Sequence, residues 1–349
     1  MIGSQRALAH SYDVALLDLD GVVYLAEQPV TGAPQALAEV RAAGMRLAFV
    51  TNNASRTPEQ VAALLRRVGV PAEPAEVITS AQAAAHYLAD RLPAGSKVLV
   101  LGAAGLIEAV TERGLRPVFS ADDEPASVVQ GFFPDLGWKQ LAEAAIAIRR
   151  GVPWLATNLD ATVPSPRGAL PGNGSMVAAL SHATGVKPAA TGKPDPAMHA
   201  ESVQRSAARR PIVVGDRLDT DIEGARRADC ASLLVFTGVT TPAELLTAVP
   251  LHRPDYLGAD VSALLESQPA VTVEGGLFRC GGFTVRIEDG VVELSSEADG
   301  PDTWDALRAL AVAGWHLMDN DQVLRRLRGA DQVALGALDR LELTGVGAG

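Results

Sequence analysis

The chain has 349 residues, of which 48% are hydrophobic, with a mean hydropathy of +0.14 and a formal net charge of −11. This length and composition support two or three domains with substantial apolar cores. The negative charge disfavours nucleic acid or an anionic membrane as the main partner. Two cysteines exclude a disulfide framework and a cysteine-rich zinc site. No signal peptide and no apolar run of membrane-spanning length are seen, which predicts a cytoplasmic protein.

The first chemically informative segment is Asp18-Leu19-Asp20-Gly21, directly after the apolar run Val14–Leu17. The run predicts a short buried strand, and Gly21 permits a turn at its end. Ligands of open α/β sheets bind outside the carboxyl ends of the strands. Two close carboxylates repel each other unless a cation neutralises them or one is protonated. The pair therefore indicates a metal site, or a nucleophile with an acid–base partner, and a simple polar turn is the alternative.

Strands and helices alternate over the next 250 residues. Strands are predicted at 46–50, 97–101, 128–132, 154–158, 211–214 and 232–236, and helices at 31–43, 60–68, 81–91, 104–113, 138–150, 176–183 and 243–249. This alternation predicts an α/β fold with a Rossmann-like, doubly wound parallel sheet. The pattern restarts near residue 80. We therefore predict a discontinuous core of residues 1–80 and 188–268 with an inserted α/β cap of residues 81–187, and one continuous large sheet is the alternative.

Residues 269–349, here called the C-terminal region, have a different pattern. Short strands are predicted at 271–274, 284–287 and 291–294, the last two joined by a hairpin at Asp289-Gly290. Helical spacing predicts a helix over 302–317, with Trp304 and Trp315 as its large apolar contacts. Val323 and Leu327, with Leu338 and Leu341, predict a second helix. We expect a small α+β domain that packs on the core as a docking or oligomerisation module.

Polar residues follow several predicted strands or turns, and their order along the chain suggests one site. They are Asp18 and Asp20, Thr51, Asn52 and Asn53, Lys193, and Asp216 and Asp221. Each group alone is compatible with a turn, a helix cap or a solvated side chain. Their combined arrangement favours a functional site at the carboxyl edge of the sheet.

The segments that carry these residues resemble a known family. LLDLDGVVY, FVTNN, TGKPDP and VVGDRLDTDI occur in this order, and PGNGSMVAAL precedes the third. They resemble the four motifs of the haloacid dehalogenase (HAD) superfamily, in its subfamily IIA branch of p-nitrophenylphosphatase-like and pyridoxal-phosphate-phosphatase-like enzymes. The resemblance covers about residues 12–265. It implies a Mg²⁺-dependent phosphomonoesterase with a type-2 α/β cap that acts through an aspartyl-phosphate.

The resemblance also implies residue roles. Asp18 would be the nucleophile, and Asp20 would be the general acid that protonates the leaving alkoxide and then the base for water. Asp216 would hold Mg²⁺ together with the Asp18 carboxylate and the Asp20 backbone carbonyl. Asp221 would act on the metal through water. The presence of Asp20 and Asp216 favours phosphate chemistry over carbon–halogen chemistry.

Phosphate and substrate contacts are expected from other segments. Thr51, Asn52 and Lys193 would bind the phosphoryl oxygens. The cap would select the substrate, and its candidates are Asn158, Asp160, Arg167 and Gly174.

The substrate is expected to be a small phosphorylated metabolite. The resemblance implies phosphoglycolate, glycerol phosphate, pyridoxal phosphate or a nucleoside monophosphate as candidate substrates. Because only 4% of the residues are aromatic, few rings are available to stack on a base or pyridine, so glycerol 3-phosphate or phosphoglycolate is favoured among these. A pyridoxal-phosphate or nucleotide phosphatase is the alternative. A non-catalytic binding or regulatory protein is the alternative from another class, and the intact set of Asp18, Asp20, Lys193 and Asp216 argues against it. A homo-oligomer is left open.

Overall fold

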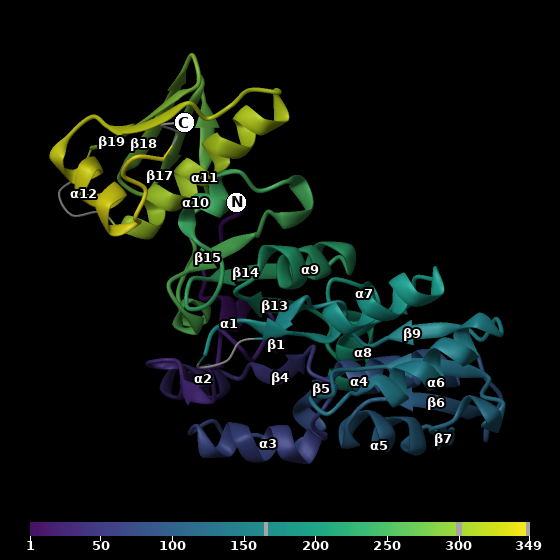
Figure 1. Ribbon diagram of the computed structural model, residues 1–349. Helices are drawn as coiled ribbons and strands as arrows, with labels where there is room; N and C mark the ends of the chain where they lie inside the picture. Colours follow the sequence, from purple (N-terminus) through teal and green to yellow (C-terminus); the bar gives the residue numbers. More distant parts are fainter. Residues whose placement is uncertain (164–166, 298–301, 347–349) are drawn as a thin grey trace. The chain divides into compact units, whose positions relative to one another are not determined.

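The computed structural model describes residues 1–163, 167–297 and 302–346. The chain divides into two compact units. The first unit comprises Met1–Leu25, Val30–Arg46 and Arg210–Gly349, and the second comprises Ala26–Pro29 and Leu47–Arg209. Parallel sheets flanked by helices confirm the predicted α/β class, and the C-terminal region adds an α+β element (Figure 1).

The parallel strands of the first unit place its polar residues. Their order is β15-β14-β13-β1, with β1 (Val14–Leu17), β13 (Pro211–Gly215), β14 (Ala231–Val235) and β15 (Tyr256–Gly258). All four residues of β1 are buried, which explains the continuous apolar run. Leu17 pairs with Val214, so β1 and β13 end at nearly the same level. Asp18 and Asp216, which follow these strands, therefore emerge side by side.

Short elements connect these strands. They are α1 (Leu8–Ser11), β2 (Tyr24–Leu25), α2 (Ala33–Ala42), the single-turn segments η3 (Leu218–Ile222), η4 (Pro250–His252) and η5 (Val261–Leu265), α9 (Glu223–Arg227) and α10 (Pro242–Leu246).

The C-terminal region forms a second sheet in the first unit, with the order β16-β17-β18-β19-β20. Its elements are β16 (Thr272–Glu274), β17 (Leu277–Cys280), β18 (Phe283–Glu288), β19 (Val291–Ser296), α11 (Thr303–Asp319), β20 (Arg326–Gly329) and α12 (Gln332–Arg340). The predicted hairpin is confirmed, because Glu288 pairs with Val291, and Asp289 and Gly290 both have positive φ. Figure 1 shows α11 against β17 and β18.

The prediction of a helix through Val323 and Leu327 is wrong. Residues 326–329 form strand β20, which pairs in parallel with β19 and places Leu327 opposite Val292. Leu327 is buried between the exposed residues Arg326 and Arg328, which is the two-residue alternation of a strand. The second helix begins only at Gln332. Strand β17 was not predicted, because its single apolar pair lies between short polar turns.

An apolar core joins the C-terminal region to the parallel strands of the same unit. Leu234 and Leu257 belong to one buried cluster with Phe283, Leu310 and other residues of the C-terminal region. Polar contacts reinforce this core. The indole Nε1 of Trp315 donates to the Leu245 carbonyl at 2.8 Å. The predicted packing of the C-terminal region on the core is therefore observed. The two share one continuous apolar core and do not merely touch at their surfaces.

The second unit contains a parallel five-stranded sheet that is covered on both faces. The strand order is β12-β9-β8-β6-β7, with β6 (Lys97–Leu101), β7 (Arg116–Val118), β8 (Ser127–Gln130), β9 (Trp154–Ala156) and β12 (Ala189–Ala190). Val98 and Val100 of β6 join one apolar cluster, whereas Leu99 and Leu101 join another. Both faces of the sheet are therefore buried, as a doubly wound fold requires.

The second unit contains further helices and strands. They are β3 (Gln28–Pro29), β4 (Arg46–Thr51), β5 (Val77–Thr79), β10 (Thr162–Val163), β11 (Leu170–Pro171), η1 (Pro74–Glu76), η2 (Ala121–Asp123), α3 (Pro58–Arg67), α4 (Ser80–Ala89), α5 (Ala104–Glu112), α6 (Trp138–Arg149), α7 (Asn173–Thr184) and α8 (Pro196–Ser206). Helix α3 begins two residues before the predicted range of 60–68, and its start is fixed by a capping box between Thr57 and Gln60.

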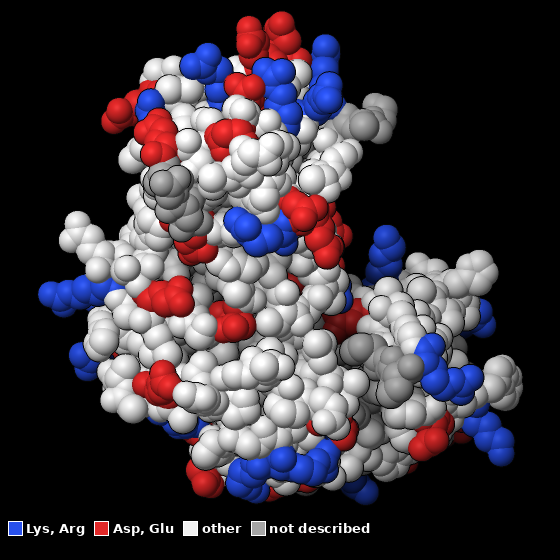
Figure 2. Space-filling view, turned by 90° about the vertical axis from the view of Figure 1, so that its left-hand side faces the viewer, with Lys and Arg blue, Asp and Glu red and all other residues white. Residues whose placement is uncertain are grey.

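The surface carries charges of both signs. On the face shown in Figure 2, lysines and arginines are interspersed with acidic side chains. Within the described residues, no helix combines the length and the apolar character needed to cross a membrane.

We predict that Gly314→Ala lowers the thermal stability of the protein. A Cβ at Gly314, in the middle of α11, would lie 2.3 Å from the Leu246 carbonyl oxygen, so α11 and α10 would have to separate. Overpacking of this kind costs about 1–3 kcal/mol. The matched control is Gly336→Ala in α12, where the nearest atom would be 3.6 Å away. That change should stabilise the helix by about 1 kcal/mol at most. Equal melting temperatures for the two variants would contradict the prediction.

Candidate functional site

The first unit contains a cluster of three carboxylates. Asp18, Asp216 and Asp221 each offer an oxygen within 4.8 Å of the others. Asp18 and Asp216 follow the paired strands β1 and β13, and Asp221 lies in η3, which follows β13. Asp216 and Asp221 are only 1% exposed. The prediction that carboxylates from separate segments meet at the carboxyl edge of the sheet therefore agrees with the geometry.

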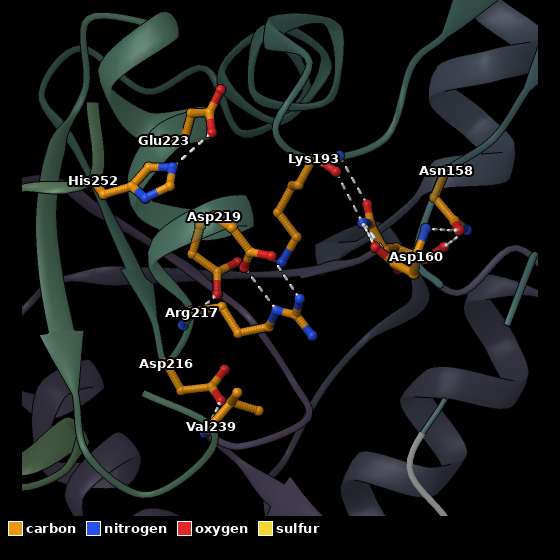
Figure 3. Close-up of polar contacts among 11 residues, drawn as sticks. Asn158, Asp160, Lys193, Asp216, Arg217, Asp219, Glu223, Val239 and His252 are labelled. Atoms are coloured by element: carbon orange, nitrogen blue, oxygen red, sulfur yellow. Dashed lines mark hydrogen bonds and ion pairs between the residues drawn. The ribbon is translucent and has the colours of Figure 1, made fainter. Parts of the chain in front are cut away.

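Three glycines allow these carboxylates to lie against the backbone. A Cβ at Gly21 or at Gly238 would lie 2.4 Å or 1.9 Å from Asp216 Oδ2, and a Cβ at Gly215 would lie 2.2 Å from the Asp221 Cβ. Gly21 also has a φ of +93°, which favours glycine. Asp216 Oδ2 accepts a 2.7 Å hydrogen bond from the Val239 backbone N–H (Figure 3).

The donor set fits a hard divalent cation. Three carboxylates this close repel one another, and burial in a medium of low dielectric strengthens the repulsion. A bound cation removes that penalty, and Mg²⁺ prefers oxygen ligands of this kind. Asp20 is not one of the three clustered carboxylates, and its residue is exposed. Its backbone pairs with Tyr24 in an isolated bridge.

The charged residues beside the cluster form separate pairs. Arg217 donates to both carboxylate oxygens of Asp219 at 3.0 and 2.8 Å, and His252 lies 2.9 Å from Glu223 (Figure 3). Asp219 is exposed and is not a member of the carboxylate cluster.

The second unit brings together the predicted phosphate-binding residues. Asn52 follows β4 and makes a two-way contact with the backbone of Lys193: its Oδ1 accepts from the Lys193 N–H at 2.9 Å, and its Nδ2 donates to the Lys193 carbonyl at 3.2 Å. The same Nδ2 lies 3.2 Å from both Asp160 oxygens. Thr51 and Lys193 are both buried. Asn52 therefore fixes the segment that presents Lys193.

The cap candidates have different environments. Asn158 is buried, donates to the Asn52 carbonyl at 2.7 Å and accepts from the Asp160 N–H at 3.2 Å, so its side chain orders the backbone (Figure 3). A Cβ at Gly174 would lie 2.2 Å from the Leu159 carbonyl oxygen, which explains a glycine at the start of α7. Arg167 is exposed.

Two features, one in each unit, were not predicted. One is the loop after β14, whose residues 237–239 contact Gly21 and Asp216; a threonine–glycine pair after a strand is the only sequence signal for it. The other is His199 in α8. His199 is fully buried, and neither ring nitrogen has a hydrogen-bond partner among the described residues. Burial, with a smaller contribution from the Lys193 charge, lowers its pKa to about 3.

Comparison with known proteins supplies independent information. A haloacid dehalogenase-like hydrolase family model matches residues 15–116, and a HAD-hydrolase-like model matches residues 190–264. Residues 280–343 match a GCN5-related N-acetyltransferase like domain. This last match gives the C-terminal region a counterpart that the sequence motifs had not indicated.

Similar proteins are named phosphatases. D-glycerol 3-phosphate phosphatase of Mycobacterium tuberculosis is 44% identical over 346 residues, which cover 97% of this chain and 96% of that protein. Acid sugar phosphatase of Staphylococcus aureus is 38% identical over 66% of this chain and 88% of its own length. The crystal structure of a glycerol phosphate phosphatase from M. tuberculosis in complex with magnesium has a TM-score of 0.88 and 44% identity, covering 98% of this chain and 100% of that chain. A p-nitrophenyl phosphatase from Archaeoglobus fulgidus has a TM-score of 0.67 and 28% identity, covering 73% of this chain and 98% of its own.

We predict that His199 destabilises the protein in acid. The lowered pKa means that the unfolded chain binds a proton at His199 below about pH 6.5, whereas the folded chain does so only near pH 3. The free energy of unfolding should therefore decrease as the pH is lowered between these values. His199 contributes at most about 1.4 kcal/mol of this decrease per pH unit. His199→Leu should show a shallower decline in denaturant-unfolding free energy between pH 7 and pH 4.5. Parallel pH profiles for the two proteins would refute this assignment.

Proposed function

The chain belongs to the haloacid dehalogenase-like hydrolases and is a phosphatase of that family, and from this we propose that it hydrolyses D-glycerol 3-phosphate with Mg²⁺ through an aspartyl-phosphate. The cluster of Asp18, Asp216 and Asp221, in which Asp216 and Asp221 are buried and Asp18 is half-buried, is the observation that carries the chemical part of the proposal. The choice of substrate is supported by the M. tuberculosis D-glycerol 3-phosphate phosphatase, which is 44% identical over a region that covers 97% of this chain.

Asp18 and Asp20 perform the chemistry in this proposal. The Asp18 carboxylate attacks phosphorus, and the bond between phosphorus and the glycerol oxygen breaks. Asp20 gives its proton to the leaving alkoxide, so glycerol departs neutral. The Asp20 carboxylate then takes a proton from water, which attacks the aspartyl-phosphate and regenerates Asp18 and inorganic phosphate. The exposure of Asp20, in contrast to the burial of Asp216 and Asp221, supports its contact with the substrate and water.

Asp18, Asp216 and the Asp20 backbone carbonyl would hold Mg²⁺, with Asp221 acting through water. When bound, the ion offsets the negative charge of the phosphoryl group and the nucleophile. The Val239 N–H and the two glycines beside Asp216 keep its carboxylate in a single orientation.

Thr51, Asn52 and Lys193 would serve the phosphoryl oxygens. Lys193 supplies a positive charge and Thr51 a hydroxyl donor. The contacts of Asn52 with the Lys193 backbone support a role in positioning that lysine, in addition to the direct role expected from the sequence. We propose the same discontinuous core of residues 1–80 and 188–268 and cap of residues 81–187, with Asp160, Arg167 and the Gly174 loop as the source of substrate selectivity.

The other small-molecule substrates remain weaker candidates. Phosphoglycolate would use the same phosphate-binding residues as glycerol 3-phosphate, but it carries a carboxylate where glycerol 3-phosphate carries hydroxyl groups. Pyridoxal phosphate or a nucleotide would need ring contacts, and the chain has only 4% aromatic residues. A panel of these phosphomonoesters, assayed for phosphate release with Mg²⁺ and with chelator, tests the substrate. The highest kcat/KM should be found for D-glycerol 3-phosphate. A higher value for pyridoxal phosphate or a nucleotide would replace the proposed substrate but leave the chemistry intact.

We predict that Asp18→Asn abolishes turnover without loss of the fold. The amide is not a nucleophile, so the rate should fall on the order of a thousandfold or more. The matched control is Asp219→Asn, which makes the same chemical change at an exposed carboxylate outside the cluster. It should keep activity near that of the unmodified enzyme. Steady-state turnover and circular dichroism of both variants provide the measurement. Asp18→Asn with more than a tenth of the original activity would rule out the covalent mechanism.

A further inference from the structure

The loop that follows β14 holds the carboxylate of Asp216 over several successive residues. Thr237 Oγ1 donates to the Gly21 carbonyl. Gly238 lies so close to Asp216 that a Cβ would be 1.9 Å from its Oδ2. The Val239 N–H donates to the same Oδ2 at 2.7 Å, and the Thr240 N–H donates to the Asp216 carbonyl at 3.1 Å. A displacement of this loop would therefore move an oxygen that the proposed function assigns to Mg²⁺.

The residue that begins this loop is in contact with the C-terminal region. The ring of Phe236 stacks on the ring of Trp304, with centroids 5.2 Å apart and planes inclined by 26°. Both side chains also pack against the apolar core shared by the two parts of the first unit. Stacked aromatic pairs contribute free energy beyond their buried area and have a defined geometry. Trp304 therefore restrains Phe236 in both position and ring orientation.

Helix α11, which carries Trp304, is itself firmly held. Asp302 caps the helix through the Trp304 N–H at 3.1 Å. Arg308 is buried, and its Nη2 donates to the Leu257 carbonyl and to Gln268 Oε1, both at 2.7 Å. Further along, Trp315 donates to the Leu245 carbonyl. The support for Phe236 is thus a helix fixed at three points along its length.

A cavity lies beside the stack. It has a volume of about 540 Å³ and is lined by Gly238, Val239 and Thr240 of the loop and by Thr303 and Arg340 of the C-terminal region. Phe236 and Trp304 also line this cavity. Their stack is a direct contact between α11 and the start of the loop, and α10, which follows the loop, packs on α11 as well.

We infer that Trp304 is a positioning residue for the metal site, and that the C-terminal region raises Mg²⁺ affinity by holding the loop that orients Asp216. This inference rests on the proposed function, because it takes Asp18, Asp216 and Asp221 as the site of Mg²⁺. It assigns the C-terminal region a role in metal binding although none of its residues is a ligand. Removing the stack should let the loop sample positions in which the Val239 N–H no longer orients Asp216.

The test measures Mg²⁺ binding to the full-length protein by calorimetry, without substrate. Trp304→Ala should raise the Kd for Mg²⁺ roughly 3- to 30-fold. Trp304→Phe keeps a ring for stacking and should change the Kd much less. Met318→Ala, at the exposed end of the same helix, should stay within about twofold of the unmodified protein. The melting temperature of each metal-free variant is recorded in parallel.

Each outcome separates the inference from simpler explanations. A folded Trp304→Ala protein with a lower melting temperature but an unchanged Kd would show a purely structural role and overturn the inference. If that variant does not fold, Phe236→Leu removes the stack from the loop side and must raise the Kd in the same way. Failure of the unmodified protein to bind Mg²⁺ would instead overturn the metal assignment in the proposed function. Mg²⁺ binding that is weakened only by Trp304→Ala and Phe236→Leu would support the inference.

Discussion

Electrostatic repulsion within the carboxylate cluster is the constraint on which the site depends. Asp216 and Asp221 are removed from water and lie close to Asp18, so a neutralising cation relieves a penalty built into the fold. The level ends of β1 and β13 create the juxtaposition, because the parallel register sets the positions from which Asp18 and Asp216 leave the sheet. The secondary structure of the first unit therefore determines the charge density of the site.

Close backbone packing gives the site its precision. Gly21, Gly215 and Gly238 let main chain approach the carboxylates at distances that a side chain would not allow. In the second unit, Gly174 serves the same purpose for the backbone around Leu159, and Asn52 fixes the backbone of Lys193. The polar groups thus fall into two kinds. Some, such as Asp216 and Lys193, are charged, and others, such as Asn52, hold the chain segments that carry the charged residues.

Sequence patterns that depend on local periodicity predicted most of the fold. The buried run before Asp18 and the hairpin at Asp289-Gly290 both follow from short-range rules, and both are observed. The prediction of a helix through Leu327 was wrong because the strand has only four residues. So few positions do not distinguish the two-residue period of a strand from the period of a helix. The supports of Asp216 could not be predicted, since the contacts of Val239 and Gly238 join segments more than 20 residues apart. His199 carries no local signal of its burial.

The shared apolar core has a consequence for how this chain responds to proteolysis. The sequence predicts a domain boundary between residues 268 and 269, in the segment between η5 and β16, yet Leu234 and Leu257 lie in the same buried cluster as Phe283 and Leu310. A nick in that segment would cut one covalent connection and leave this core intact. The two fragments would remain associated as a noncovalent complex. A denaturing gel would show two bands, as for separable domains, although the fragments stay together under native conditions.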